Sequence, residues 1–357
     1  MENWSNFNLE KILGVPLEEF DTISDNIEGN VHEFDIQKRN GKKRHIIAPG
    51  PRLKYILKGI GWRILSAYKP HRSAHGFQKN KSIKTNAMPH VGSNAVGSID
   101  VKDFFPSVNE KHLNNILLGN KRICKMCKNY NGMCSGYCHP SIYHNRANNY
   151  PHKCEEIKAI LIPDFCEKTG YQSLLKRVIN VCIYKDHTPQ GFPTSPMLAN
   201  LALRGLDIMM ERHCNKHNIR YTRYADDLCF STMTDNKRTL KDKTLGVATS
   251  LLRKFGFAVN KKKTKYRSRA ARLLICNVVV NDKLSLAKYR VKIFRAEVHH
   301  ATVKNKDTTT KRKIRELKGF ASFLKSINET VGSKYMTQLI SFERMRNDGD
   351  SWPARVD

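Results

Sequence analysis

Two apolar segments that meet acidic residues constrain the fold of this 357-residue chain more than any other feature. Ala95–Val101 is an apolar run that predicts a buried strand ending near Asp100. Tyr221–Thr232 predicts two strands that meet at Ala225-Asp226-Asp227. Acidic residues are usual in turns and rare inside strands, so each acid taken alone could be an ordinary polar turn.

These acids together predict more than a turn. Asp226 and Asp227 repel each other unless a cation lies between them. A third carboxylate, Asp100, from a neighbouring strand would complete a site for divalent cations, and Mg²⁺ prefers such hard oxygen ligands together with substrate phosphates. Two ions about 3.5–4 Å apart stabilise both the attacking and the leaving oxygen of a phosphoryl transfer, which is the chemistry of nucleotide polymerisation.

The charge of the chain points to the same class of partner. There are 63 Lys+Arg against 32 Asp+Glu, a formal charge of +31, while a hydrophobic content of 40% is enough for a folded core. Such a surplus favours a polyanion as partner. No segment approaches the ~18–20 consecutive apolar residues of a membrane span, and the first residues lack a signal-peptide pattern. We therefore expect a cytoplasmic protein that does not enter a membrane.

Other segments predict a mixture of strands and helices. His32–Ala48 predicts a hairpin around Asn40-Gly41, with several cations at or near its tip. Helical spacing of apolar residues covers 52–69, and Thr194 or Ser195 can cap a helix that runs to about Cys214. Residues 286–300 and 312–346 also have helical periodicity.

The acids lie within a recognisable set of motifs. Ser98–Val108 reads Ser-Ile-Asp-Val-Lys-Asp-Phe-Phe-Pro-Ser-Val, Pro189–Pro196 reads Pro-Gln-Gly-Phe-Pro-Thr-Ser-Pro, and Tyr221–Leu228 reads Tyr-Thr-Arg-Tyr-Ala-Asp-Asp-Leu. Their order and spacing resemble those of reverse transcriptases. The element Asn86-Ala-Met-Pro-His90 makes the chain similar to the bacterial retron reverse transcriptases in particular.

The resemblance covers roughly residues 30–345 and implies an α+β fold. We expect a right-hand polymerase with fingers, palm and helical thumb, plus a Cys-rich insert. The expected regions are an N-terminal lead-in (1–30), the fingers and first palm segment (31–120), the Cys/His-rich insert (121–156), the fingers and palm with the Tyr-Ala-Asp-Asp hairpin (157–283), and an RNA-binding helical thumb (284–357).

The resemblance also implies roles for individual residues. Asp100, Asp226 and Asp227 match the family's catalytic aspartates, which bind two Mg²⁺ ions, whereas Asp103 is expected to be a surface or hairpin acid. Arg44 matches a finger residue that clamps the triphosphate, although Lys42 or Lys43 could serve. A bulky residue under the incoming sugar selects deoxynucleotides, and a Gln-Gly pair contacts the nucleotide. The nucleotide-binding residues implied are therefore Arg44, Phe105, Gln190 and Gly191.

Two further elements concern retron enzymes in particular, and neither has an implied catalytic role. Asn86 and His90 are expected to make structural hydrogen bonds. Where retron enzymes usually carry Val-Thr-Gly, this chain has Ile275-Cys276-Asn277, a divergence within the family.

A segment rich in cysteine and histidine lies between the first aspartate and the glutamine motif. Cys124, Cys127, Cys134 and Cys138 have spacings that suit a tetrahedral zinc site, and His139 or Cys154 could replace one of them. The segment has almost no branched aliphatic residues, so metal binding would have to replace a core. Reduced cysteines in a loop are the alternative. The remaining cysteines, at 166, 182, 214, 229 and 276, are expected to be packed thiols.

The implied function is RNA-directed DNA synthesis from dNTPs. By resemblance, synthesis starts from a guanosine 2′-hydroxyl of a cognate structured non-coding RNA, gives a branched RNA–DNA product, and serves anti-phage defence together with a separate effector protein. Arg253–Arg272 and Lys304–Lys318 supply 16 cations and two acids where a polymerase holds its template and primer. A reverse transcriptase of another lineage, intron-encoded or of another defence type, and a catalytically silent RNA-binding scaffold are the alternatives.

Overall fold

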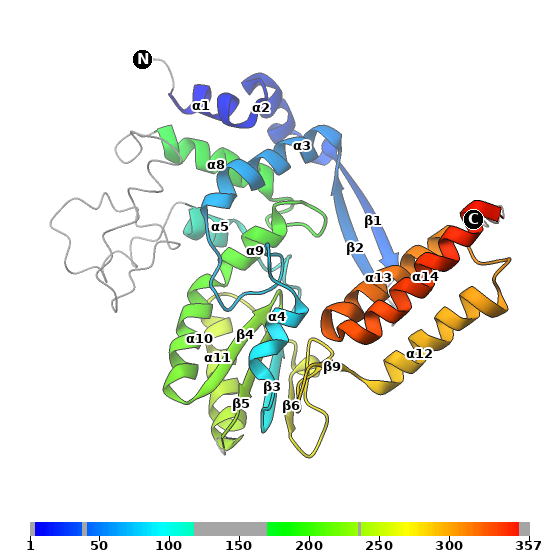
Figure 1. Ribbon diagram of the computed structural model, residues 1–357. Helices are drawn as coiled ribbons and strands as arrows, with labels where there is room; N and C mark the ends of the chain where they lie inside the picture. The colour runs from blue at the N-terminus through cyan, green and yellow to red at the C-terminus, as the bar shows by residue number, and fades with distance from the viewer. Residues whose placement is uncertain (1–3, 38–40, 118–169, 235–236, 350–357) are drawn as a thin grey trace. The chain divides into compact units, whose positions relative to one another are not determined.

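A computed structural model describes residues 4–37, 41–117, 170–234 and 237–349 (Figure 1). By its internal contacts the chain divides into two compact units. Each unit draws on three separate stretches of sequence, so neither coincides with one of the regions expected from the motifs. Those region boundaries stay a prediction. Unit 1 comprises residues 1–77, 99–213 and 246–264, and unit 2 comprises residues 78–98, 214–245 and 265–357.

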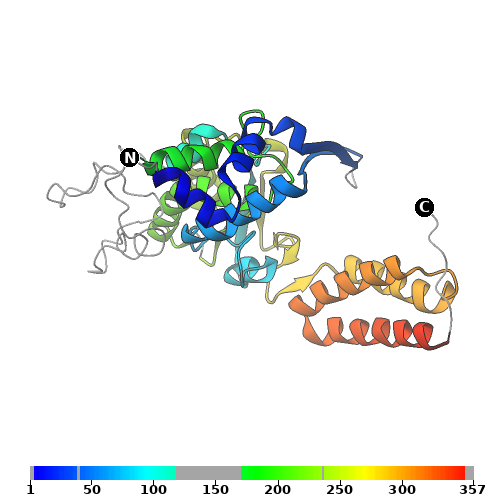
Figure 2. The same cartoon turned by 90° about the horizontal axis from the view of Figure 1, so that it is seen from above.

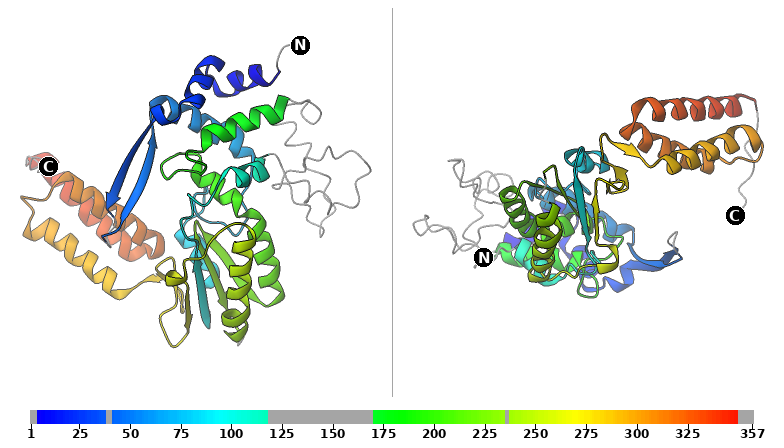
Figure 3. Two further views of the ribbon diagram at one scale, coloured as in Figure 1. Left: turned by 180° about the vertical axis from the view of Figure 1, so that it is seen from behind. Right: turned by 90° about the horizontal axis from the view of Figure 1, so that it is seen from below.

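Unit 1 contains a two-stranded antiparallel ribbon, which Figure 3 shows from behind. Strand β1 (Val31–Gln37) pairs with β2 (Lys43–Pro49), with Val31 opposite Pro49. Gly41, in the connection, has φ +77°, the left-handed conformation that favours glycine in tight turns. The hairpin predicted from Asn40-Gly41 is confirmed.

Most of the other described elements of unit 1 are helices. Helix α3 (Pro51–Gly59) begins with proline at its first position and continues as a π-turn over Ile60–Ile64, which confirms the helix predicted at 52–69. The helix predicted from residue 195 to Cys214 is interrupted at Leu203. Thr194 occupies the N-cap position, as predicted, but its side chain makes no capping bond. Among the described residues, the other helices that lie wholly or mainly in unit 1 are α1 (Trp4–Leu13), α2 (Leu17–Asp25), α5 (Glu110–Leu117), α8 (Gly170–Cys182), α9 (Ser195–Ala202), α10 (Arg204–Lys216) and α11 (Leu245–Lys254).

A four-stranded sheet forms the base of unit 2. Its order is β4-β5-β3-β6, with β4 (Ile219–Tyr224), β5 (Asp227–Thr232), β3 (Ala95–Asp100) and β6 (Lys265–Ser268). The two predicted strands of Tyr221–Thr232 and the buried strand ending near Asp100 are therefore confirmed. The short helix α4 (Ile83–Ala87) begins with a capping box, in which the Ser82 side chain accepts from the Thr85 N–H and the Thr85 hydroxyl accepts from the Ser82 N–H.

Within the described residues, the C-terminal part of unit 2 is mainly helical, as the helical periodicity of 286–300 and 312–346 predicts. Three very short strands, β7 (Leu274–Ile275), β8 (Val278–Val279) and β9 (Ser285–Leu286), precede α12 (Lys288–His299), α13 (Lys311–Ile327) and α14 (Glu329–Gly349). The helix pattern at 312–346 is divided at Asn328, whose side chain accepts from the Val331 N–H and so caps α14. Figure 2 shows α13 and α14 side by side. Gly332 allows this approach, because a Cβ there would overlap the backbone of Lys325.

The Cys/His-rich insert lies outside the described residues, including its proposed ligands Cys124, Cys127, Cys134 and Cys138. Within the part of the chain that the structure describes, no helix is long and apolar enough to cross a membrane.

Candidate active site

The hairpin of β4 and β5 carries two of the three candidate aspartates. Tyr224 pairs with Asp227, which leaves Ala225 and Asp226 as a two-residue turn. Ala225 has φ +55°, a conformation unusual for a residue with a Cβ. Both carboxylates are half-exposed at this turn, so they remain accessible to a cation or a substrate.

A buried arginine supports the strained turn. Arg223 is fully buried, and its Nη1 donates to the carbonyl oxygen of Ala225 at 2.8 Å. A buried guanidinium needs partners for its donors, and it also places positive charge behind the two aspartates. Motif matching did not single out this residue. The signal that could have done so is a cation on the same strand face as Ile219 and Tyr221, three residues before Asp226.

The Asn86–His90 element lies against the same two strands within unit 2. His90 is fully buried; its Nδ1 lies 2.7 Å from Ser231 Oγ on β5, and its Nε2 lies 2.7 Å from Thr222 Oγ1 on β4. The Thr222 hydroxyl also donates to the carbonyl oxygen of Asn86 at 3.2 Å. Since that hydroxyl has one proton, it accepts from Nε2–H of His90, and Nδ1 accepts from Ser231. The prediction of structural hydrogen bonds is confirmed for His90.

Replacing His90 with alanine is expected to lower the free energy of unfolding by about 2–5 kcal/mol, because two buried hydroxyls lose their partner and a cavity remains. Chemical denaturation of the full chain measures this change. Met88, two residues earlier and 50% exposed, provides the matched control, since Met88→Ala should change stability by less than about 0.5 kcal/mol. Equal stability of the His90 and Met88 variants would show that the buried hydrogen bonds do not form.

Asp100, the last residue of β3, is 9% exposed, and its contacts lie in unit 1. Lys263 Nζ lies 2.9 Å from its Oδ2, and the N–H of Asn260 donates to its carbonyl oxygen. A cation therefore already contacts this carboxylate, which indicates an electrostatic environment suited to positive charge. Asp103, by contrast, is exposed with φ +46°, which confirms that it is a surface acid.

The segment after Asp100 contacts the glutamine motif within unit 1. The carbonyl oxygen of Phe105 accepts from Thr188 Oγ1 at 2.8 Å, and that of Val108 accepts from the Thr188 N–H at 2.8 Å. The ring of Phe105 is half-buried and lies 5.9 Å from that of Phe77 and 5.5 Å from that of Phe104. The structure therefore places Phe105 near the start of the Pro-Gln-Gly loop.

The Pro-Gln-Gly loop also contacts strand β2. The N–H of Ile47 donates to the carbonyl oxygen of Gln190 at 2.8 Å. Gly191 has φ +138°, and a Cβ at this position would overlap the carbonyl oxygen of Ile47. Arg44 lies on β2 three residues before Ile47, with its side chain exposed. Backbone contacts in unit 1 thus connect the segments that carry Phe105, Gln190, Gly191 and Arg44.

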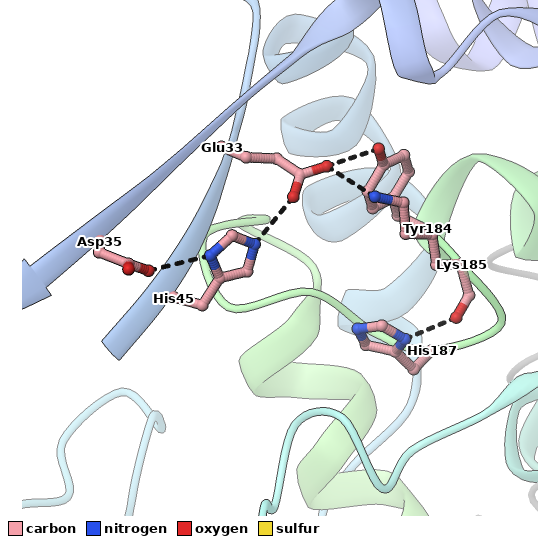
Figure 4. Close-up of polar contacts among 6 residues, drawn as sticks. All are labelled: Glu33, Asp35, His45, Tyr184, Lys185 and His187. Atoms are coloured by element: carbon pink, nitrogen blue, oxygen red, sulfur yellow. Dashed lines mark hydrogen bonds and ion pairs between the residues drawn. The ribbon is translucent and has the colours of Figure 1, made fainter. Parts of the chain in front are cut away.

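Side chains reinforce the attachment of the ribbon to the loop before this motif, as Figure 4 shows. Glu33 on β1 accepts from the Tyr184 hydroxyl at 2.7 Å and from Lys185 Nζ at 2.9 Å. Its other oxygen lies 2.8 Å from His45 Nε2, and His45 Nδ1 lies 3.1 Å from Asp35. His45 thus lies between two carboxylates.

These contacts shift the pKa values of the groups involved. The Tyr184 hydroxyl, then Lys185 and His45, lower the pKa of Glu33 to about 2. Hydrogen bonds to Asp35 and then to Glu33 raise the pKa of His45 above its ordinary value of 6.5. Glu33 therefore strengthens the attachment at any pH above about 4.5 and loses this effect only as the pH falls towards 2. His45 strengthens it fully below about pH 6.5 and loses this effect as the pH rises through its raised pKa.

Raising the pH above 6.5 is therefore expected to loosen the ribbon. Hydrogen exchange of the β1 and β2 amides, corrected for the intrinsic exchange rate, should show lower protection at pH 8.5 than at about pH 6. The change is modest and decreases with salt, because the groups are exposed. His45→Gln does not titrate and serves as the control. A pH dependence that persists in this variant would exclude His45 as its origin.

The cysteines of the described regions divide into two kinds. Cys182, Cys214 and Cys229 are buried, as expected for packed thiols, and burial raises the pKa of Cys182 to about 12. Cys276 is half-buried and packs against the hydrophobic core of unit 2, as expected for a packed thiol, and its Sγ also lies 3.7 Å from Asp227 Oδ2. Cys166 lies outside the described residues. Contact with Cys276 and burial raise the pKa of Cys229. The sequence indicated Cys276 as a departure from a motif and as a packed thiol, but it did not indicate that the thiol lies beside Asp227.

Comparisons with known proteins identify the family. Residues 149–278 match the family model described as reverse transcriptase (RNA-dependent DNA polymerase). The retron Ec86 reverse transcriptase of Escherichia coli is 26% identical over 315 residues, 87% of this chain and 81% of that protein. The retron Mx65 reverse transcriptase of Myxococcus xanthus is 30% identical over 300 residues, 83% of this chain. This chain belongs to the retron reverse transcriptases. It is thus an RNA-directed DNA polymerase.

The lengths of these retron reverse transcriptases differ. The chain spans 61% of the Mx65 enzyme. Among solved structures, apo telomerase from Candida tropicalis is similar with a TM-score of 0.46 and 13% identity, over 94% of this chain and 64% of the telomerase chain. The family model includes Gln190 and the Asp226-Asp227 pair.

Proposed function

We propose that this retron reverse transcriptase copies part of a cognate structured non-coding RNA into single-stranded DNA. Synthesis starts from the 2′-hydroxyl of a guanosine and gives a branched RNA–DNA molecule, which acts with a separate effector protein in anti-phage defence. The observation that carries this proposal is the buried Asn86–His90 element. Its hydrogen bonds to β4 and β5 connect a motif characteristic of retron enzymes directly to the strands that flank Asp226-Asp227.

Asp100, Asp226 and Asp227 are the proposed ligands of two Mg²⁺ ions. Their hard carboxylate oxygens suit magnesium, and the ammonium of Lys263 beside Asp100 is a cation already held at one of them. Strands β5 and β3 are neighbours, and the N–H of Asn94, just before β3, donates to the carbonyl oxygen of Thr232 at the end of β5. Bound magnesium would stabilise the attacking and leaving oxygens of nucleotidyl transfer.

The residues of unit 1 are proposed to bind the incoming dNTP. Arg44, with Lys42 or Lys43 as alternatives, would pair with the triphosphate. Gln190 would contact the nucleotide, and Gly191 lets the loop approach β2. The aromatic ring of Phe105 would exclude a ribose 2′-hydroxyl by its bulk. The backbone contacts of this loop with Ile47 and Phe105 support these roles, because they hold the segments that carry the proposed nucleotide-binding residues next to one another.

The cations of 253–272 and 304–318 are proposed to hold template, primer and RNA. Lys261, Lys262 and Lys263 are exposed on a single helical turn, and the surface of α13 adds further lysines and arginines. Phosphate contacts by such residues give affinity without reading sequence and produce a steep dependence on salt. Structured RNA would be recognised through its shape and loops.

The test is to purify the protein from its native locus, digest the nucleic acid with RNase and sequence the remainder. A discrete single-stranded DNA with a residual ribonucleotide branch, absent in the Asp226→Ala/Asp227→Ala variant, is the expected result. Unbranched DNA would favour a reverse transcriptase that primes elsewhere. RNA without any DNA product would favour the catalytically silent scaffold.

Zinc in the Cys/His-rich insert remains a proposal, supported by the spacing of Cys124, Cys127, Cys134 and Cys138 alone. Metal analysis of the purified protein tests it. Less than about half an equivalent of zinc per chain, under conditions that preserve structural zinc, would exclude the site.

A further inference from the structure

Two thiols and a carboxylate converge beside the Tyr-Ala-Asp-Asp turn in unit 2. Asp227 and Cys229 are two residues apart on β5, and side chains with this spacing share one face of a strand. Cys276 is the first residue of the two-residue turn between β7 and β8. One ligand atom from each of Asp227, Cys229 and Cys276 lies within 4.8 Å of the others.

The side-chain amide of Asn86 lies at the same place. Its Nδ2 is 3.4 Å from the Cys276 sulfur and 3.9 Å from the Cys229 sulfur. Asn86 is fully buried, and its Oδ1 has no hydrogen-bond partner among the described residues. Rotation of the amide by half a turn would exchange the two atoms and direct Oδ1 towards the sulfurs. The cluster therefore offers two sulfur and two oxygen atoms.

The spacing of these atoms suits a tetrahedral ion. Zn–S bonds of about 2.3 Å and Zn–O bonds of about 2.0–2.2 Å put neighbouring ligand atoms about 3.5–3.8 Å apart. The Cys276 sulfur and Asp227 Oδ2 are already 3.7 Å apart, and since the three ligand atoms lie within 4.8 Å of one another, no separation among them needs to shorten by more than about 1 Å. Sulfur ligands select soft or borderline ions over magnesium.

We propose that Asp227, Cys229 and Cys276 form a binding site for a thiophilic divalent cation, Zn²⁺ or Cd²⁺, with Asn86 Oδ1 as a fourth ligand. Binding itself depends only on this cluster. Its consequence rests on the proposed function: an ion held here engages Asp227, a carboxylate needed for magnesium, and so inhibits DNA synthesis.

Cadmium binding to the full-length protein tests the site directly through the ultraviolet charge-transfer absorption of cadmium–thiolate bonds. The matched variant is Cys276→Ser, which keeps a hydrogen-bond donor and removes the sulfur. The cysteines of the insert are present in both proteins, so the difference in absorption between the two proteins comes from the Asp227–Cys229–Cys276 cluster. The variant should lose the cluster's share of the absorption and bind this cadmium at least about tenfold more weakly. Cys182→Ala, which removes a buried thiol of unit 1, should retain it.

Inhibition of DNA synthesis by zinc at fixed magnesium tests the consequence. The Cys276→Ser variant should need at least about ten times more zinc for half-inhibition than the unmodified protein. Equal cadmium absorption in the two proteins would overturn the site. Equal sensitivity to zinc would overturn the inhibitory role. A protein that synthesises no DNA would instead contradict the proposed function, and the cadmium measurement would still test the site.

Discussion

Replacing Asp227 with asparagine is expected to lower the rate of DNA synthesis by about 1,000-fold or more. The amide keeps the size of the side chain but removes the charge that would hold magnesium at the reacting phosphate. Metal stabilisation of transition-state charge contributes several kcal/mol, and each 1.36 kcal/mol corresponds to a factor of ten. Extension of a primed RNA template at saturating dNTP and magnesium measures the loss.

Asp103 provides the matched control for this experiment. It lies three residues after Asp100, is exposed and has φ +46°, a conformation that asparagine tolerates well. Asp103→Asn should therefore retain activity within about twofold, because a surface substitution of this kind changes little. If the Asp227 variant retained activity comparable to this control, Asp227 would not be a magnesium ligand.

Replacing Gly191 with alanine is expected to reduce kcat/KM for the dNTP by about 100-fold or more. The backbone at φ +138° is accessible essentially to glycine alone, and a Cβ would overlap the Ile47 carbonyl oxygen. Relief of the overlap requires the loop to move away from β2, which breaks the Ile47–Gln190 hydrogen bond and displaces Gln190. A total cost of about 3 kcal/mol corresponds to the stated loss.

Steady-state kinetics with a single dNTP, together with thermal unfolding, separates this local effect from general destabilisation. Gly246→Ala is the control, since that glycine lies in helix α11 with open space at the Cβ position. It should leave the kinetics unchanged and raise the free energy of unfolding by about 0.5–1 kcal/mol. If the Gly191→Ala variant had the same kcat/KM as the Gly246→Ala variant, DNA synthesis would not require the close approach of the loop to β2.

Local patterns in the sequence predicted the main elements of the fold. Alternation and turn residues located the β1–β2 and β4–β5 hairpins, and helical spacing located α3, α12 and α13. These signals work because a strand, a turn or a helix depends on residues a few positions apart. The interruptions at Leu203 and Asn328 were not predicted, because the spacing of apolar residues does not mark where a helix ends. The Asn328 side chain caps α14 through a bond only three residues away.

The candidate site was predicted by motif, but its supports were not. Asp226 and Asp227 stand out in the sequence, whereas the role of the buried Arg223 emerges only from its contact with Ala225. His90 could be identified as a residue with a structural role, yet its partners Thr222 and Ser231 lie 132 and 141 residues away. Nothing in a local pattern indicates contacts at such a separation.

By itself, the sequence determined the chemistry of this retron reverse transcriptase: hard carboxylates at strand ends, a surplus of cations and a glutamine–glycine loop. Only the tertiary structure decided which neighbours hold these groups. It placed the thiol of Cys276 beside Asp227, 49 residues away, and Ile47 beside Gly191. The physical reason is that hydrogen bonds and close contacts act over a few ångströms in space, and chain folding alone determines which distant residues come within that range.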